Sequence, residues 1–226
     1  MSERSIRDLL ASDAALRSLF RYVVERHAND AAHDVGHLLR VADWTLRLGG
    51  PEVSSPEAIA AALLHDLVSV RKDSEDRSKA SEWSAQQAEP LLRERGFDGD
   101  AVLRITAAIR DHSFSSGAAP SDKLGEALQD ADRLDALGAI GVMRLAVTGA
   151  GMGSVCAHLE DPWAERRPLD DRRFMLDHFF AKLLLLPERM ITEAGKAEAG
   201  RRAAWMISFL EQFGNEIGAP FRGAGG

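Results

Sequence analysis

Three short fragments of this chain place imidazole and carboxylate groups on segments that otherwise have the pattern of apolar helices. They are residues 33–37 (HDVGH), the pair His65-Asp66, and Asp132. A buried carboxylate is costly unless it is paired or bound to a metal ion. Two imidazoles and two carboxylates from three helices would form a plausible cage for a divalent cation. Such a cation would generate hydroxide from bound water near neutral pH, so the fragments predict metal-assisted hydrolysis.

The histidine of the first fragment that is expected to point inward is His37. It shares one helix face with Val41, Trp44 and Leu48, at spacings of four, three and four residues, and that face is apolar. A single histidine on an apolar face is more often a satisfied core residue than a ligand. What favours a metal site is the combination of an inward histidine, a His-Asp pair and a later aspartate on successive helices.

The His-Asp pair ends the most apolar helix expected in the chain. Pro56 opens this helix, which is apolar on nearly every face over residues 58–67. A helix that is apolar all round belongs in the centre of a fold. Asp66 shares a face with apolar residues of that helix, so its carboxylate is expected to face the core. Asp132 follows Leu128 by four residues on a later helical segment.

Helical periodicity dominates the rest of the chain, and no segment alternates apolar and polar residues as a strand would. A polar loop is expected over residues 69–80. A shorter helix punctuated by glycines is expected after residue 138, followed by an irregular stretch over 149–170 and a frayed tail from residue 218. Further helices are expected over residues 35–48, 80–95, 99–112, 122–136, 171–185 and 188–216.

These elements predict an all-α fold. The length of 226 residues suffices for one large domain, and no repeat or linker-like segment divides the chain. We therefore expect a single domain over residues 1–226, with its core at about 20–215 and a flexible tail at 218–226.

Composition argues against several classes of function. The net charge of −7 does not suit a general nucleic-acid-binding surface, so an anionic substrate must be met by local basic residues. The single cysteine, Cys156, rules out an internal disulfide framework and suits a reducing compartment. The longest strongly apolar stretch, 58–64, is too short to span a membrane, and no signal peptide is apparent. We expect a cytoplasmic protein with a small-molecule partner, without nucleic acid or membrane.

The motifs match a known family more closely than a bare pattern of His, His-Asp and Asp would. The chain resembles the HD-domain superfamily of metal-dependent phosphohydrolases, and in particular its bacterial YedJ/YpgQ-type subgroup. The resemblance covers roughly residues 30–210. The motifs that carry it are HDxxHxxRV at 33–41, ALLHD at 62–66, HSFS at 112–115, DADRLDALGAIG at 130–141, DP at 161–162, RPLDD at 167–171, LDHF at 176–179 and KLL at 182–184.

The resemblance implies an all-helical fold with one divalent cation. The superfamily's first ligand precedes the valine of a His-x-x-x-Val motif, which selects His37, and the other ligands would be His65, Asp66 and Asp132. The implied activity is hydrolysis of phosphate esters or anhydrides. Cleavage of nucleoside (deoxy)triphosphates to monophosphate and pyrophosphate is the favoured reaction. Manganese is the favoured cation, and His/Asp ligation also accommodates Mg²⁺, Co²⁺, Ni²⁺, Zn²⁺ or Fe²⁺.

Basic residues near these motifs are candidates for phosphate binding. Lys72 and Arg77 follow the His-Asp pair in a charged loop, where cations would neutralise phosphate oxygens and assist catalysis. Their acidic neighbours favour the alternative of an ordinary solvated loop. His33, one turn before His37, would contact phosphate or support a ligand, unless it is simply exposed.

His112, at the end of a helix, is a candidate both to protonate a leaving group and to bind phosphate, because its intrinsic pKa suits either role near neutrality. A structural pairing is the alternative. Asp66 or Asp132 would accept a proton from water. Arg133 directly follows Asp132 and is expected either to contact substrate or to pair with Asp135.

Two departures from other branches of the superfamily narrow the chemistry. Some HD nucleotidases have Glu three residues after the His-Asp pair, where this chain has Ser69. Dinuclear HD oxygenases and phosphodiesterases have two extra histidines before the final aspartate, whereas only His112 lies between Asp66 and Asp132 here. We therefore expect a mononuclear site and hydrolysis rather than oxygen chemistry.

The sequence leaves other functions open. An HD-type phosphatase or phosphodiesterase would cleave another phosphoester, and a non-catalytic sensor would bind nucleotide without turnover. The glycine run at 146–153 looks like the turn of a dinucleotide-binding oxidoreductase, but that motif needs a preceding strand, so we expect a mobile loop instead. The arginines at 166–167, in the irregular stretch, would cap a substrate pocket.

Overall fold

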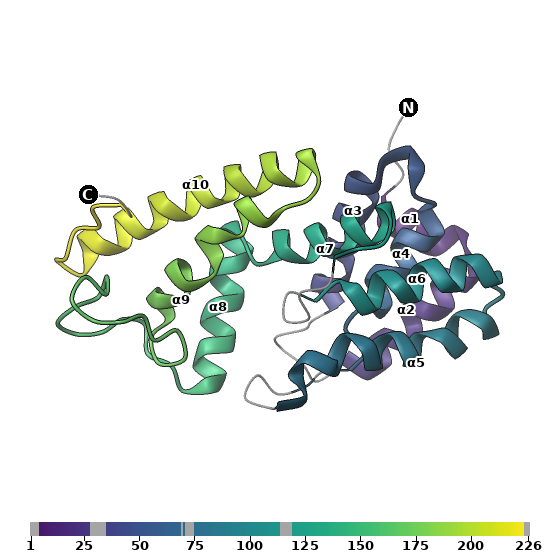
Figure 1. Cartoon of the computed structure of the whole chain (residues 1–226), viewed down its shortest axis with the longest axis horizontal. Coiled ribbons are helices and arrows are strands. Elements are labelled where there is room, and N and C mark those ends of the chain that lie inside the picture. Colours follow the sequence, from purple (N-terminus) through teal and green to yellow (C-terminus); the bar gives the residue numbers. More distant parts are fainter. Residues whose placement is uncertain (1–4, 28–34, 69, 71–74, 114–118, 224–226) are drawn as a thin grey trace. The chain divides into compact units, whose positions relative to one another are not determined.

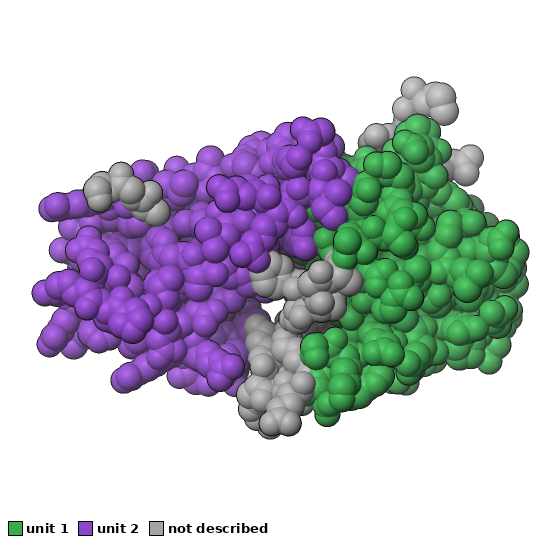
Figure 2. Space-filling model, viewed as in Figure 1, with its two compact units in different colours: residues 1–132 green, residues 133–226 purple. Residues whose placement is uncertain are grey.

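The computed structural model describes residues 5–27, 35–68, 70, 75–113 and 119–223. In these ranges the chain forms ten α-helices and short 3₁₀ helices, with no strand beyond an isolated bridge between Val155 and Phe174 (Figure 1). The predicted all-α fold is therefore confirmed. The helices belong to two compact units, residues 1–132 and 133–226 (Figure 2). The expectation of a single domain over 1–226 stays a prediction.

The helices of the first unit agree closely with those expected from the sequence. The predicted loop over 69–80 is partly wrong, because Glu75–Lys79 forms a 3₁₀ helix that leads directly into the next α-helix. In chain order the α-helices are α1 (Ile6–Ser12), α2 (Ala14–His27), α3 (Val35–Gly49), α4 (Ser55–Leu64), α5 (Ala80–Glu94), α6 (Gly99–Asp111) and α7 (Lys123–Asp135), whose last turn belongs to the second unit.

Helix α4 lies at the centre of the first unit, as its composition predicts. Every residue from 58 to 64 is fully buried, and α2, α3 and α6 pack against the helix. Pro56 lies in its first turn, where the missing backbone N–H costs nothing. The start of α4 is tied to α6 by a bidentate ion pair between Glu57 and Arg104, at 2.8 and 2.9 Å. The other end of α4 therefore presents His65 and Asp66 from a rigid support.

The second unit contains α8 (Gly138–Met152), α9 (Met175–Ala181) and α10 (Glu193–Glu216). The glycine run at 146–153 was expected to form a loop, and this expectation is wrong. Its residues through Met152 are helical, and Gly153 ends the helix at a φ of 77°. The Met175 side chain packs closely on this helix, since a Cβ at Gly149 would lie 2.8 Å from it. A glycine turn for a dinucleotide is therefore absent from this part of the described chain.

The last helices are shorter than the sequence predicts. The segment expected as a helix over 171–185 forms α9 and then a 3₁₀ turn at Leu183–Leu185. A second 3₁₀ turn, Pro187–Arg189, precedes α10, so the final helix begins at Glu193 rather than at 188. The Thr192 hydroxyl caps α10 by accepting from the backbone N–H of Gly195 at 3.0 Å. This local cap, rather than the proline, defines where α10 starts.

The tail predicted to be frayed from residue 218 makes contacts with the second unit at Ala219 and Phe221, and its flexibility stays a prediction. The indole N–H of Trp163 donates to the backbone oxygen of Ala219 at 2.8 Å. The ring of Phe221 lies 4.9 Å from that of Trp163 and 5.8 Å from that of Phe180. Glycine at position 214 makes room for this return, because a Cβ there would lie 2.7 Å from the backbone nitrogen of Phe221. Residues 224–226 lie outside the described chain.

A helix that spans a membrane must be both long and apolar. No single helix of the described chain meets both requirements. Helices α7 and α8 meet them only when taken together, with a break between them.

Candidate metal centre

Three helices of the first unit bring the predicted ligands together. His37 comes from α3, His65 and Asp66 follow α4, and Asp132 comes from α7. The two imidazole Nε2 atoms lie 3.3 Å apart. Oδ1 of Asp132 lies 3.6 Å from Nε2 of His37 and 3.8 Å from Nε2 of His65. Four residues that span almost a hundred positions of sequence therefore meet at one point, as the sequence predicts.

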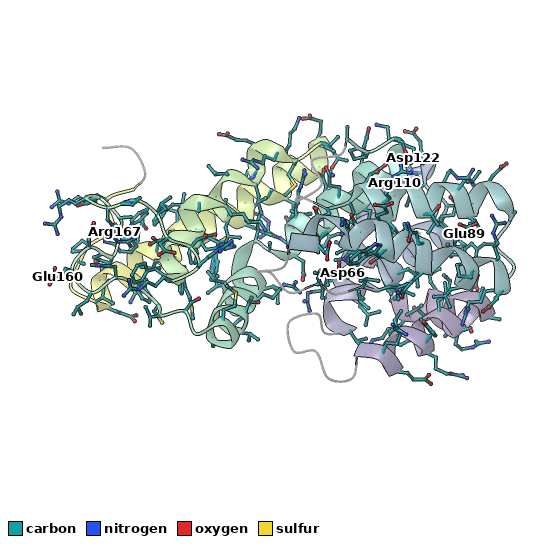
Figure 3. The ribbon with its side chains drawn as sticks, turned by 60° about the horizontal axis from the view of Figure 1, so that its bottom comes forward. Asp66, Glu89, Arg110, Asp122, Glu160 and Arg167 are labelled. Atoms are coloured by element: carbon teal, nitrogen blue, oxygen red, sulfur yellow. The ribbon has the colours of Figure 1, made fainter. Side chains whose placement is uncertain are left out.

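The carboxylate of Asp66 lies between this cluster and His112. Its Oδ2 lies 3.5 Å from Nε2 of His65 and 3.9 Å from Nε2 of His37, while its Oδ1 lies 3.7 Å from Nε2 of His112. Figure 3 shows Asp66 among the helices of the first unit. The imidazoles are almost wholly buried, whereas the side chains of Asp66 and Asp132 are 28% and 32% exposed. The centre is therefore closed on its histidine side and accessible on its carboxylate side.

Backbone hydrogen bonds orient the two histidines that end helices. Nδ1 of His65 lies 2.8 Å from the backbone oxygen of Ala62, and Nδ1 of His112 lies 2.6 Å from that of Ile109. A carbonyl oxygen can only accept, so each Nδ1 must carry the proton. In the neutral ring this leaves the Nε2 lone pair directed into the cluster. Orientation through the other ring nitrogen is typical of histidines that bind metals.

The carboxyl ends of α4 and α6 add an electrostatic potential that favours a cation at the cluster. His65 and His112 are the C-terminal caps of these two helices. The carboxyl end of a helix carries a partial negative charge from its unpaired carbonyl groups. Both helices therefore direct their negative ends at the same cluster of side chains.

Burial and mutual attraction determine the charges of the groups. Burial lowers the pKa of His65 to about 4, so its ring is neutral near pH 7. For Asp66, burial is outweighed by the imidazoles of His65 and His112, which hold its pKa well below the usual range. Burial would likewise raise the pKa of Asp132, but the nearby imidazoles of His65 and His37 have the larger effect, so its pKa is lowered. At neutral pH the centre therefore offers a neutral imidazole and two ionised carboxylates.

The pKa of His112 is shifted in the opposite direction to that of His65. Burial alone would lower its pKa, but the nearby carboxylate of Asp66 raises the pKa above its ordinary value. The ring lies edge-on to that of His65, with centroids 4.9 Å apart. The structure thus places His112 beside the predicted ligands Asp66 and His65, and its role at the site stays a prediction.

The arrangement of donor atoms fits a divalent cation. Ligands at about 2.1 Å around a tetrahedral ion lie roughly 3.4 Å from one another. The distances above, from 3.3 to 3.9 Å, bracket this value. Two overlapping triads have donor atoms all within 4.8 Å of one another: His37 with His65 and Asp132, and His65 with Asp66 and His112. The residue types and their spacing therefore match a metal centre.

The phosphate-binding candidates are placed only in part. His33 and Lys72 lie outside the described residues. Arg77 belongs to the 3₁₀ helix Glu75–Lys79, but its side chain lies outside the described part of the structure. Arg133 donates to the backbone oxygen of Arg189. Asp135, the partner suggested for Arg133 by the sequence, forms an ion pair with Arg144 at 3.1 Å.

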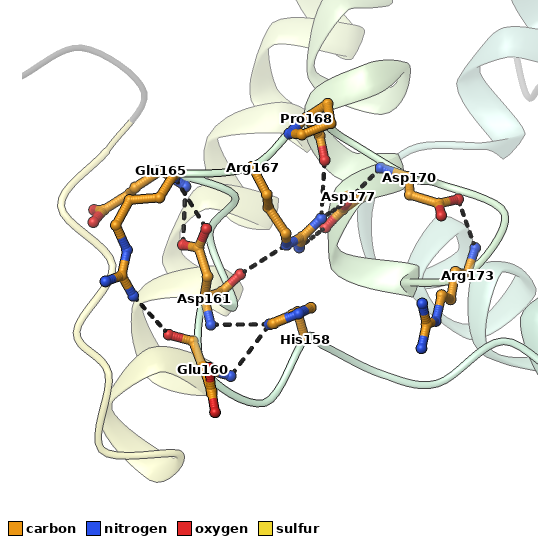
Figure 4. Close-up of polar contacts among 10 residues, drawn as sticks. His158, Glu160, Asp161, Glu165, Arg167, Pro168, Asp170, Arg173 and Asp177 are labelled. Carbon is orange, nitrogen blue, oxygen red and sulfur yellow. Dashed lines mark hydrogen bonds and ion pairs between the residues drawn. The ribbon is translucent and has the colours of Figure 1, made fainter.

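Arg167 belongs to a polar network of the second unit (Figure 4), and Arg166 donates to the backbone oxygen of Glu160 in the same segment. Arg167 forms a bidentate pair with Asp177 at 2.5 and 2.7 Å, and this carboxylate is fully buried. The carboxylate of Asp161 accepts from the backbone N–H groups of Glu165 and Arg166 at 3.0 Å each. The guanidinium of Arg167 therefore forms an ion pair that stabilises the fold of the 153–174 segment.

Two buried polar residues near the centre were not identified from the sequence. The carboxamide of Gln129, on α7, donates to the backbone oxygen of Asp111 at 3.0 Å. The hydroxyl of Ser84, on α5, accepts from the backbone N–H of Val68 at 3.1 Å. For Gln129 a signal was available, because it lies one turn before Asp132 on the same helix. For Ser84 no signal existed, because its partner is a backbone group from a distant segment.

Comparison with known proteins gives an independent view of the same region. The family model described as the HD domain matches residues 34–137, a range that includes all four predicted ligands and His112. The protein YpgQ of Bacillus subtilis is 29% identical over 188 residues, which cover 83% of this chain and 85% of YpgQ.

Solved structures show the same similarity. A Bacillus subtilis YpgQ structure in complex with ADP matches with a TM-score of 0.67 and 26% identity, covering 88% of this chain and 93% of that one. The structure of an HD-superfamily hydrolase from Bacillus thuringiensis matches with a TM-score of 0.67 and 30% identity, covering 90% of this chain and 96% of that one.

Proposed function

Because the chain belongs to the HD-domain family, we propose that it is a metal-dependent phosphohydrolase that acts on nucleotides. The observation that carries the proposal is the convergence of two buried imidazoles and two accessible carboxylates in the first unit. The reaction we favour is hydrolysis of a nucleoside (deoxy)triphosphate to the monophosphate and pyrophosphate.

His37, His65, Asp66 and Asp132 would hold one divalent cation. Manganese is the cation we favour, and the mixed nitrogen and oxygen donors also suit Mg²⁺, Co²⁺, Ni²⁺, Zn²⁺ or Fe²⁺. When bound, the cation would lower the pKa of water and neutralise charge on a phosphoryl oxygen. The accessible side of the centre, where Asp66 and Asp132 are exposed, is where a phosphate would approach.

Different side chains of the protein accept and donate the protons of the reaction. In the proposed step a water oxygen forms a bond to the α-phosphorus, and the bond from that phosphorus to the bridging oxygen breaks. A carboxylate oxygen of Asp66 or Asp132 accepts the proton from water. Nε2 of His112, protonated under the influence of Asp66, gives a proton to the departing pyrophosphate. Lys72 and Arg77 are proposed to bind the remaining phosphate charge, since the chain as a whole is acidic.

The choice of nucleotides as substrates has support from a relative. YpgQ, which matches this chain over most of its length, has been crystallised with ADP. A diphosphate bound there is consistent with recognition of both a base and a phosphate chain. We extend this to the present protein as a cytoplasmic nucleotide hydrolase.

Titration of Mn²⁺ into metal-stripped protein tests the proposed ligands. Asp132→Asn keeps the shape of the side chain and removes its charge, so we expect manganese affinity measured by calorimetry to fall by at least about tenfold. Asp43→Asn is the matched control, because Asp43 is a surface carboxylate of α3 paired with Arg47. Equal affinities in the two variants would contradict the assignment. Tight binding of nucleotide without any turnover would instead indicate a sensor.

A further inference from the structure

The side chain of Gln129 connects the helices that carry His112 and Asp132. Its Nε2 on α7 donates to the backbone oxygen of Asp111, the last residue of α6, at 3.0 Å. Both residues are buried, with 3% and 6% of their surface exposed. A buried hydrogen bond between groups distant in sequence restricts how the two helix segments can move against each other.

The chemistry of helix ends explains part of this contact. The last carbonyl groups of an α-helix have no partner inside the helix, and a buried carbonyl needs a donor. Gln129 supplies that donor for Asp111. A donor that served only this purpose would stabilise the fold without affecting any particular side chain.

The position of the bond gives it a second consequence. Asp111 directly precedes His112, whose ring is fixed to the same helical turn by its hydrogen bond to the backbone oxygen of Ile109. Gln129 lies three residues before Asp132 on α7, so the two side chains project from neighbouring positions of that helix. One helix thus brings a carboxylate to the metal centre and also holds the peptide that carries His112.

We propose that Gln129 is a positioning residue that fixes the imidazole of His112 relative to the carboxylates of the metal centre. This inference rests on the proposed function, in which His112 transfers a proton to the leaving group. Nε2 of His112 lies 3.7 Å from Oδ1 of Asp66, so a small movement at the end of α6 changes that distance directly. Misplacement of a reacting group by about 1 Å can cost on the order of a hundredfold in rate.

The test uses the full chain with Gln129 replaced by methionine. Methionine has a similar length and volume but cannot donate a hydrogen bond to Asp111. Gln86→Met is the matched control, because Gln86 is exposed on α5 and its amide donates to the exposed Glu82, at 3.4 Å. Gln129→Asn, which keeps the amide but shortens its reach, provides a second variant in case the methionine variant does not fold.

The first readout does not depend on activity. With ¹⁵N-labelled histidine and diamagnetic Mg²⁺, the Nδ1–H of His112 should give a hydrogen-exchange-protected signal, identified by its loss in His112→Asn. We expect this signal to broaden or shift in Gln129→Met and to be unchanged in Gln86→Met. An unchanged His112 signal in both Gln129 variants would overturn the proposal, whether or not the protein hydrolyses nucleotides.

The second readout separates positioning from general stability. We expect Gln129→Met to lower kcat by about tenfold, with manganese affinity and KM nearly unchanged. In the His112→Asn background the same substitution should have no further effect on kcat, because its influence passes through His112. Equal losses in both backgrounds would contradict the proposal. If the wild-type protein turns over no nucleotide, the proposed function fails, while the nuclear magnetic resonance result still decides the position of His112.

Discussion

Two buried histidines occupy equivalent places at the ends of two helices, and yet their pKa values are shifted in opposite directions. His65 and His112 each donate from Nδ1 to the backbone oxygen three residues earlier. Burial lowers the pKa of His65 to about 4, whereas Asp66 raises the pKa of His112 in spite of its burial. The same backbone arrangement thus provides one neutral ring suited to ligation and one ring able to carry a proton.

The lowered pKa of His65 predicts that the metal-free protein loses stability as the pH falls. The unfolded chain binds a proton at this histidine below pH 6.5, but the folded protein does so only near pH 4, so unfolding takes up a proton in between. From pH 7 to pH 5 we expect the free energy of unfolding to fall by about 2 kcal/mol on account of this group. Urea denaturation at the two pH values in the presence of a chelator measures it.

The variant His65→Gln provides the comparison for this prediction. It removes the titrating ring, so its stability should change less between pH 7 and pH 5 than that of the wild type. The absolute stability of the variant is not the criterion, because the substitution also disturbs packing. Identical pH slopes for the two proteins would show that His65 is not the group responsible.

At the scale of elements, the end of α4 is held by a neighbour on α5. The hydroxyl of Ser84 accepts from the backbone N–H of Val68, two residues beyond Asp66. Ser84 is 1% exposed, so no water can take its place without rearrangement. The path of the chain out of the metal centre therefore depends on one hydroxyl group.

We predict that Ser84→Ala lowers manganese affinity by about tenfold, the lower end of the effects seen when residues that support metal ligands are removed. It should lower stability by about 1 kcal/mol, because the N–H of Val68 loses its partner. Ser81→Ala is the control, since Ser81 is also buried on α5 and its hydroxyl makes no hydrogen bond with any described residue. Equal manganese affinities in the two variants would contradict this role for Ser84.

The sequence predicts elements well where a single local pattern decides them. The bounds of α3, α5, α6 and α7 follow from apolar periodicity and from polar or glycine residues at their ends. It fails where distant contacts decide. The glycine run forms the end of α8, where Met175 lies close to Gly149, and Phe221 of the tail packs against Trp163. No local pattern contains these contacts.

The same distinction holds for the candidate site. His37, His65, Asp66 and Asp132 were predicted because each is an ionisable residue on an apolar segment, which is a local signal. Ser84 could not be predicted, because its role depends on the path of the chain between α4 and α5, sixteen residues earlier. Residue types therefore indicate ligands, whereas the residues that support them emerge only from the fold.

At the scale of the whole molecule, the two units have different polar cores. All residues of the metal centre lie in residues 1–132, while the second unit contains the buried pair of Arg167 and Asp177. Arg167 also lies over the ring of Phe174, at 4.5 Å. Removal of one member of a buried ion pair leaves the other charge without compensation, which costs about 3–5 kcal/mol.

We therefore predict that Arg167→Met strongly destabilises the second unit without changing manganese affinity. Hydrogen exchange followed by mass spectrometry should show loss of protection around residues 153–177. The control is Arg201→Met, which removes an ion pair with Glu198 on the surface of α10, where such a pair is worth at most about 1 kcal/mol. Loss of metal binding in Arg167→Met would contradict the independence of the metal centre from this ion pair.

The most direct test of the account is a product assay with defined nucleotides. Metal-stripped protein is restored with Mn²⁺ and incubated with ribo- and deoxyribonucleoside triphosphates, and anion-exchange chromatography separates monophosphate, diphosphate, pyrophosphate and orthophosphate. We predict monophosphate and pyrophosphate in equal amounts, and a loss of more than about a hundredfold in Asp66→Asn, whose helix content should remain that of the wild type. Orthophosphate as the sole inorganic product would contradict the proposed bond, and full activity in Asp66→Asn would contradict the metal centre itself.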